Sequence, residues 1–184
     1  MIAYLKGQVR MRGKDSVVVV IDNVGYEVFL PALALEKAKV GEEREFFTHE
    51  YLRENARELY GFPTKEELGL FRDLMKVSGV GPKMALNVLS LGASRVREAI
   101  TKGDAGILGS VSGVGKKTAQ KIVLELKGTI EMGDISSQFT EEALDALRRL
   151  GYSQREASEA LSNVQDAETT EEKIKAALKI LGKR

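Results

Sequence analysis

A nine-residue segment occurs twice in the chain, as "VSGVGPKMA" at residues 77–85 and as "VSGVGKKTA" at residues 111–119, here called the first and second hairpin. In each, two glycines two positions apart allow the backbone to come close to a ligand, and a helix is expected to begin directly after them. Main-chain N–H groups at the positive end of a helix dipole favour an anion. A lysine follows each glycine pair, as Lys83 in the first hairpin and Lys116 with Lys117 in the second, which suits a phosphate rather than a base edge.

The repetition favours a phosphate site over a simple turn. Glycines in a single copy would most often only make a sharp turn between helices. Both hairpins, however, carry valine at their first and fourth positions and alanine at their ninth, so the whole unit is duplicated, and a pair can hold two phosphates of a duplex. The predicted DNA phosphate-binding residues are Gly79, Val80, Gly81, Lys83, Gly113, Val114, Gly115, Lys116 and Lys117.

Positive charge gathers in the segment that holds both hairpins. Residues 1–64 carry 9 Lys and Arg against 10 Asp and Glu, residues 65–130 carry 11 against 6, and residues 131–184 carry 8 against 11. The formal net charge of +1 therefore conceals a basic middle between two acidic parts. Such a distribution is typical of a module that binds a polyanion.

Composition excludes several other classes of protein. The chain has 184 residues, of which 43% are hydrophobic and 30% charged, which predicts one to three small globular domains. It has no apolar run that could cross a bilayer and no signal-peptide pattern at its start, so we expect no membrane association and a cytoplasmic location. With no cysteine and only His49 as histidine, we predict neither metal nor cofactor, and a structural or surface role for His49.

Five segments within residues 1–63 are typical of β-strands, because they are short, rich in Val, Phe and Tyr, and separated by Gly, Asp, Asn or charged turns. They are residues 1–9, 16–23, 25–31, 44–52 and 56–62. Five strands at this spacing favour a small closed barrel of the oligonucleotide-binding (OB) kind, although other small barrels would show the same pattern.

A helical period follows, which makes the expected fold class α+β. Thr64 with Glu67 predicts a helix start, and Pro82 predicts a second one directly after the first hairpin. The second hairpin opens a helix that we expect to end at Gly128. Residues 64–130 therefore form a predicted central helical domain.

The rest of the chain is expected to be a separate small unit. Residues 131–139 lie in a stretch with Gly, Ser and acidic residues but no periodicity, which predicts a flexible linker. Residues 140–184 show three helical patterns, the first beginning at Thr140 and bearing Leu144, Leu147 and Leu150. We predict a three-helix, UBA-like bundle with a thin core.

Taken together, "FTHEYLRENARELYGF" at residues 47–62, the paired hairpins and the acidic carboxy-terminal bundle resemble the RuvA family of bacterial Holliday junction branch migration subunits. The likeness covers essentially the whole chain in the same order. It implies tandem helix-hairpin-helix motifs, and a homotetramer that holds four-way junction DNA open in a square-planar form, with one tetramer or two per junction. It also implies a role in DNA recombination, DNA repair and the SOS response.

The resemblance further implies a pin and a motor. The family places an acidic pin at the junction centre, in the loop that joins the last two barrel strands, and this loop is "LRENA" here. Glu54 matches the first acid of the pin, and Asn55 stands where a second carboxylate is common. The carboxy-terminal bundle is implied to dock the RuvB ATPase, with Ile174, Leu178 and Leu181 as candidates, and the RuvC resolvase is a further expected partner.

Enzyme and RNA-binding alternatives stay open. DNA glycosylases share the pattern GVGxKTA, with a catalytic lysine that would fall on Lys117 and an aspartate for which Asp134 could stand. Asp134 falls in the predicted linker, however, and no cysteines are present for an iron–sulfur site. The scattered acidic residues do not favour a metal-dependent nuclease. No GxxxxGK[ST] phosphate loop is present, so ATP hydrolysis must belong to a partner. An RNA-binding barrel with helical appendages remains compatible with the composition.

Overall fold

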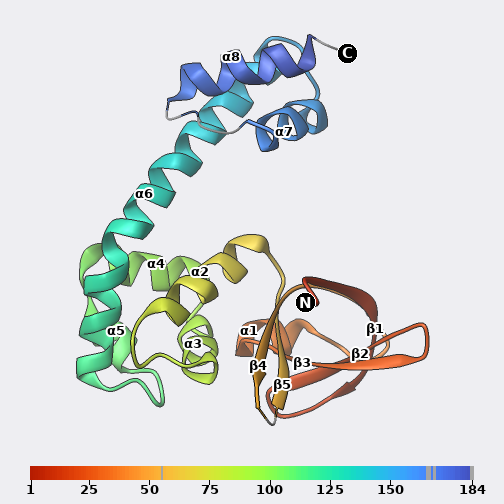
Figure 1. Ribbon diagram of the computed structural model, residues 1–184, viewed down its shortest axis with the longest axis vertical. Helices are drawn as coiled ribbons and strands as arrows, with labels where there is room; N and C mark the ends of the chain where they lie inside the picture. The colour runs from red at the N-terminus through yellow and green to blue at the C-terminus, as the bar shows by residue number, and fades with distance from the viewer. Residues whose placement is uncertain (55, 165–166, 168, 183–184) are drawn as a thin grey trace. The chain divides into compact units, whose positions relative to one another are not determined.

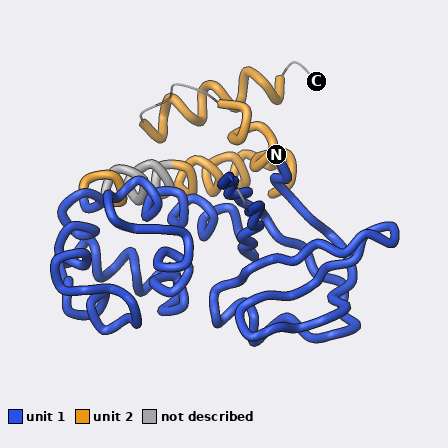
Figure 2. The backbone as a smooth tube through the Cα atoms, turned by 60° about the horizontal axis from the view of Figure 1, so that its bottom comes forward, with its two compact units in different colours: residues 1–127 blue, residues 128–184 orange. Residues whose placement is uncertain are grey.

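The computed structural model describes residues 1–54, 56–164, 167 and 169–182, with the backbone alone for residues 131–139. Figure 1 shows the elements along the chain, and Figure 2 shows its two compact units, Met1–Lys127 and Gly128–Arg184. In the described part of the chain, no helix combines the length and the apolar character needed to cross a membrane.

The amino-terminal part of the first unit is a closed barrel, as predicted. Its described strands are β1 Tyr4–Arg12, β2 Ser16–Ile21, β3 Val24–Phe29, β4 Glu43–Arg53 and β5 Ala56–Phe62. They follow the order β1-β2-β3-β5-β4 around the barrel, and all neighbours are antiparallel except β3 and β5. Alternate residues such as Val17, Val19 and Val28 are fully buried, which is the period of two that a barrel interior requires.

Two local features shape the barrel. The β2–β3 turn places Asp22 and Asn23 at φ values of 46° and 67°, a left-handed conformation that Asp and Asn tolerate better than most residues. A short helix, α1 Ala32–Lys37, lies between β3 and β4 and buries Ala34 and Leu35 in the barrel core. The sequence patterns did not predict α1, because its six residues cover less than two helical turns.

The helical part of the first unit follows β5. Its described helices are α2 Lys65–Lys76, α3 Pro82–Leu89, α4 Ala93–Lys102, α5 Ala105–Gly109 and the start of α6 Lys116–Arg149. The predicted helix start at Thr64 is confirmed, since its Oγ1 accepts a hydrogen bond from the Glu67 backbone N–H at 3.2 Å. The start of α3 at Pro82 is confirmed as well.

An aromatic cluster attaches α2 to the barrel. The Phe71 ring lies 5.4 Å from Tyr60, 4.8 Å from Phe62 and 5.5 Å from the His49 ring, between ring centroids. Phe71, Tyr60 and Phe62 are all fully buried. Burial, and then the positive charge of Arg72, lower the pKa of His49 below its ordinary value. His49 therefore has the structural surroundings that its position suggested.

The predicted helix end at Gly128 is wrong, and so is the irregular segment expected over residues 131–139. The backbone of both lies within α6, which runs from Lys116 to Arg149 and also passes through the expected helix start at Thr140. Gly128 does not have the positive φ of a helix-terminating glycine. Glycine and serine inside a helix cost only about 0.5–1 kcal/mol each, and this stretch contains no proline that would stop a helix.

The second unit contains the end of α6 with α7 Gln154–Ser162 and α8 Thr170–Leu181. Both α7 and α8 begin with a full capping box, formed by Ser153 with Glu156 and by Thr169 with Glu172. The buried core consists of Ala143, Leu147, Ala157, Ala160, Leu161 and Ala177. Because four of these six residues are alanines, the helices pack closely around a small core.

Candidate nucleic-acid interface

The first hairpin is a tight turn between α2 and α3. Gly79 has a φ of +90°, which a residue with a side chain rarely adopts. The Val80 N–H donates to the Val77 carbonyl at 3.0 Å, and the Ala85 N–H donates to the Gly81 carbonyl at 2.9 Å, so that α3 begins directly at the turn. The side chain of Val80 is buried, which leaves only its main chain available to a ligand.

The second hairpin repeats this geometry between α5 and α6. Gly113 has a φ of +87°, the Val114 N–H donates to the Val111 carbonyl at 3.0 Å, and the Ala119 N–H donates to the Gly115 carbonyl at 2.9 Å. The side chain of Val114 is buried in the same way as that of Val80. The duplication in sequence is therefore a duplication of backbone geometry.

The glycines at the helix starts keep the approach to the backbone open. A Cβ atom added at Gly81 or Gly115 would meet no atom within 4 Å, so space for a ligand exists on that side of the backbone. The first turns of α3 and α6 contain no acidic residue that would compete for the N–H groups. The positive ends of both helix dipoles are therefore accessible to an anion.

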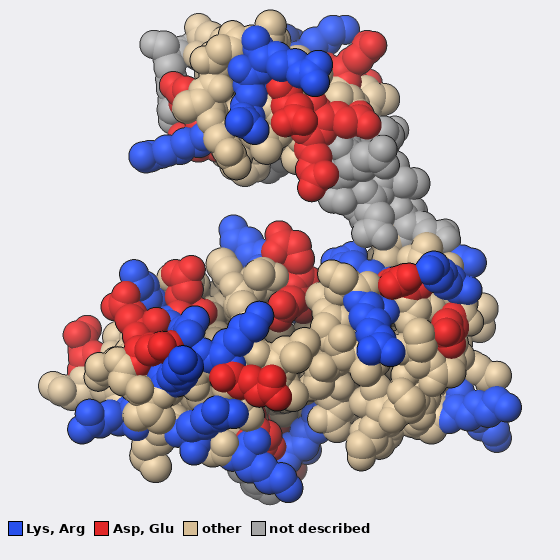
Figure 3. Space-filling model, turned by 180° about the vertical axis from the view of Figure 1, so that it is seen from behind, with Lys and Arg blue, Asp and Glu red and all other residues tan. Residues whose placement is uncertain are grey.

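The three predicted lysines lie in the first turns of α3 and α6. Lys83, Lys116 and Lys117 are exposed, and no carboxylate of a described residue lies within 4.0 Å of their ammonium groups. Residues 65–130 carry the basic excess, whereas Figure 3 shows both signs of charge close together over the barrel on the face it draws. The hairpins can therefore offer fixed donors beside mobile positive charge, a combination suited to phosphate.

A hydrogen bond that the sequence did not reveal joins α3, the helix after the first hairpin, to the second hairpin. The Nδ2 group of Asn87, on α3, donates to the carbonyl oxygen of Ser112 at 3.3 Å. Ser112 precedes Gly113 in the second hairpin. The helix that starts at one hairpin thus contacts the loop of the other.

The β4–β5 connection carries the predicted pin residue Glu54. Arg53 pairs with Ala56 across the two strands, so the connection is short, and Glu54 is exposed in it. Asn55 lies outside the described residues. The guanidinium carbon of Arg53, the residue before Glu54, lies 4.9 Å from the centroid of the Tyr51 ring.

Comparison with known proteins decides the family. Family models described as "RuvA N terminal domain", "SAM-like Helix-hairpin-helix tandem" and "RuvA, C-terminal domain" match residues 1–61, 71–128 and 138–182. A protein of Halothermothrix orenii named "Holliday junction branch migration complex subunit RuvA" is 44% identical over 195 residues, which cover 100% of this chain and 99% of the relative. Proteins of the same name from Caldanaerobacter subterraneus and Dehalococcoides mccartyi are 39% and 41% identical, over 100% and 97% of both chains. The chain belongs to the RuvA family.

The second unit contains the residues that match the carboxy-terminal RuvA domain, 138–182. Ile174, Leu178 and Leu181, the candidate docking residues, are half-buried and pack against the core of the unit. They therefore contribute to packing and retain some exposed surface. The prediction that the first helix of this unit bears Leu150 is wrong, because α6 ends at Arg149 and Leu150 is 61% exposed.

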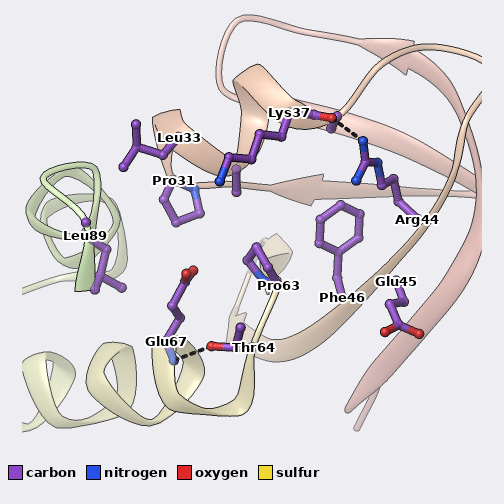
Figure 4. A pocket seen from close by; sticks show the side chains of 13 residues that line it. Pro31, Leu33, Lys37, Arg44, Glu45, Phe46, Pro63, Thr64, Glu67 and Leu89 are labelled. Carbon is purple, nitrogen blue, oxygen red and sulfur yellow. Dashed lines mark hydrogen bonds between the residues drawn. The ribbon is translucent and has the colours of Figure 1, made fainter. Parts of the chain in front are cut away.

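The cavity drawn in Figure 4 lies between the barrel and the helices that follow it in the first unit. It has a volume of about 290 Å³ and is lined by residues of α1, β4, α2 and α3. The Glu67 carboxylate points into it, and burial raises the pKa of this group, against the effect of Lys37. Lys117, which would be the catalytic lysine of a DNA glycosylase, is exposed. The side chain of Asp134 lies outside the described residues.

Proposed function

We propose that this chain is a non-catalytic, structure-specific DNA-binding subunit that forms a homotetramer on four-way junctions and holds them open in a square-planar form. It directs a separate RuvB-type ATPase motor to the junction for branch migration in recombination and repair, in the cytoplasm and together with a RuvC-type resolvase. The observation that carries the proposal is the pair of hairpins with matching backbone geometry and exposed lysines, in a chain that belongs to the RuvA family over its whole length.

The hairpins support recognition of shape rather than sequence. Main-chain N–H groups and lysines bind phosphate oxygens, which are the same for every base. Two hairpins per chain provide two such contacts, and four chains around a junction provide eight. Specificity for a four-way junction then arises from the positions of these contacts in the assembled tetramer.

Glu54 is proposed as the pin residue of each chain. A carboxylate close to the phosphates at a crossover repels them, and this repulsion acts over a Debye length of about 8–10 Å. It limits how closely the backbones can approach and helps bases to separate. Exchange of Glu54 for Gln is expected to slow branch migration by the complete complex; an unchanged rate and unchanged junction binding would remove this role.

The second unit is proposed to dock the motor. The half-buried residues Ile174, Leu178 and Leu181 expose apolar surface beside a small core, as a contact for a partner helix requires. Leu181→Lys is expected to abolish stimulation of a RuvB-type ATPase while junction binding persists. Loss of junction binding in parallel, with intact folding, would argue against a separate docking role.

The test of the main proposal is a gel-shift titration with a synthetic four-way junction and a linear duplex of equal length, repeated at several salt concentrations. We expect strong preference for the junction and a steep salt dependence. Replacement of Lys83, Lys116 and Lys117 by Ala should weaken binding and reduce the slope of log K against log salt by about 0.9 for each phosphate that the protein no longer neutralises.

A matched triple variant controls for charge alone. Lys39, Lys175 and Lys179 are exposed lysines outside both hairpins, and their replacement by Ala removes the same net charge. This control should bind nearly as the wild type does. Equal losses in both triple variants would contradict the hairpin contacts, and equal binding of junction and duplex by the wild type would contradict structure-specific recognition. Release of a base from damaged DNA, or tighter binding of structured RNA, would favour the alternative functions.

A further inference from the structure

An open cavity lies beside the first hairpin, between the barrel and α3. It has a volume of about 240 Å³, and its polar lining residues come from the β1–β2 turn, from β5 and from α3. These residues are Lys14, Asp15, Tyr60, Lys83, Asn87 and Ser90. Lys83 is the lysine of the first hairpin, so the cavity continues the candidate phosphate site towards the barrel.

The walls of this cavity are held in place by hydrogen bonds. The Leu30 N–H donates to the Asp15 carbonyl at 3.1 Å, which fixes the β1–β2 turn to the end of β3. The Ala32 N–H donates to Ser90 Oγ at 3.0 Å, which fixes the start of α1 to the end of α3. The turn that carries Lys14 is therefore connected to the hairpin helix through the barrel, as a preorganised site requires.

The charges in the cavity favour an anion. Lys14 and Lys83 are exposed, and no described carboxylate lies within 4.0 Å of either ammonium group. Asp15 contributes one negative charge, so the lining keeps a net positive charge. The other polar groups already have partners: Tyr60 donates to Glu58, Asn87 to Ser112, and Ser90 to Leu86. The two lysines are thus the main contacts left for a ligand.

The cavity beside the second hairpin has a different lining. The cavity beside it, of about 250 Å³, is lined by Ala105, Gly106, Gly109, Lys116 and Gln120. These residues come from α5 and α6 and include one lysine. Unlike the cavity beside the first hairpin, this cavity has no lysine from the barrel in its lining.

We infer that the cavity beside the first hairpin is a further binding site for the DNA phosphate backbone. Lys14 contacts the phosphate next to the one that the first hairpin holds, so the barrel contributes to the grip on the arm of the junction. The inference rests on the proposed function and extends the DNA-binding surface beyond the helix-hairpin-helix motifs. A nucleic-acid strand suits the site, because neighbouring phosphates on one strand follow each other at short intervals.

The experiment compares the full-length Lys14→Gln variant with wild type in junction binding at several salt concentrations. One phosphate contact adds about 0.9 to the slope of log K against log salt. Between 1 M and 0.1 M salt, this slope corresponds to a factor of about 8 in the binding constant. We therefore expect Lys14→Gln to bind at least about 8-fold more weakly with a smaller slope, and Lys14→Arg to bind as wild type does. Lys39→Gln, which removes an exposed barrel lysine outside the cavity, is the matched control. Lys14 lies in an exposed turn, and a circular dichroism melt checks that the variant folds.

The outcomes separate this inference from the proposed function. If wild type prefers the junction but Lys14→Gln behaves as Lys39→Gln does, the phosphate site at Lys14 is overturned and the proposed function stands. If wild type binds no DNA, both are overturned. A weaker Lys14→Gln with an unchanged salt slope would also overturn the site, because a phosphate contact must release counterions.

Discussion

The two hairpins are copies of one unit set in different surroundings. With an offset of 34 residues, Leu74 corresponds to Leu108 and Ala85 to Ala119, and all four are fully buried. The glycines at the turns have φ values of +90° and +87°. The two hairpins therefore have identical residues at the positions that determine their backbone conformation.

The positions that attach each hairpin to the rest of the molecule differ. Phe71, which packs against the aromatic residues of the barrel, corresponds to Ala105 at the start of α5. Asn87, which donates to the second hairpin, corresponds to Lys121 on α6, whose ammonium group lies 3.9 Å from Glu125. The first hairpin is thus supported by the barrel and the second by helices. Phosphate binding by the two hairpins then depends on the backbone geometry that they share. The stability of each hairpin depends on the residues that pack it against the rest of the unit.

The largest expected effect comes from Phe71→Ala, which removes the aromatic contacts that attach the first hairpin, and not the second, to the barrel. Loss of a fully buried phenylalanine is expected to lower the free energy of unfolding by about 3–5 kcal/mol. Amide hydrogen exchange should become faster in the first hairpin than in the second. Leu124→Ala, at a residue that is 82% exposed, is the control and should change stability by less than about 0.5 kcal/mol. Equal loss of protection in both hairpins would contradict separate attachment.

Gly79→Ala and Gly113→Ala are expected to have a smaller effect than Phe71→Ala, and the effect should be the same in both hairpins. Each places a side chain at a positive φ, which costs on the order of 1–3 kcal/mol and disturbs the N–H groups of the turn. Gly81→Ala is the control, since Gly81 has a φ of −93° and space around its Cα, and should cost less than about 1 kcal/mol in stability. Urea unfolding of the three variants, and junction titration of Gly79→Ala and Gly113→Ala, check the comparison. Clearly unequal effects of Gly79→Ala and Gly113→Ala would show that the packing around each hairpin, rather than the shared backbone conformation, determines how much the turn tolerates a side chain.

The parts of the fold that sequence could predict are those with a local cause. The strands followed from alternation and turn residues, and the hairpins followed from glycine spacing beside lysine. The course of α6 through residues 131–139 was not predictable, because glycine and serine weaken a helix without forbidding it. The exposure of Leu150 and the Asn87–Ser112 hydrogen bond depend on tertiary arrangement, which no periodicity records. For the same reason Lys14 could not be recognised as a neighbour of Lys83.

The smallest expected effect tests the attachment of the first hairpin by pH. Burial and Arg72 lower the pKa of His49, whose ring contacts Phe71. Because the folded state then binds fewer protons than the unfolded state, this contribution to stability is present above the unfolded pKa, near 6.5, and is lost as pH falls through and below it. His49→Asn should therefore reduce the loss of melting temperature between pH 7.5 and pH 5. Since the group is partly solvated, the difference from wild type should stay below about 1 kcal/mol, or roughly 2–4 °C. A variant whose melting temperature depends on pH as steeply as that of wild type would show that protonation of His49 does not act on the attachment of α2. The barrel would then hold the first hairpin through the Tyr60, Phe62 and Phe71 rings and the Ala32–Ser90 hydrogen bond, without a contribution from the charge of His49.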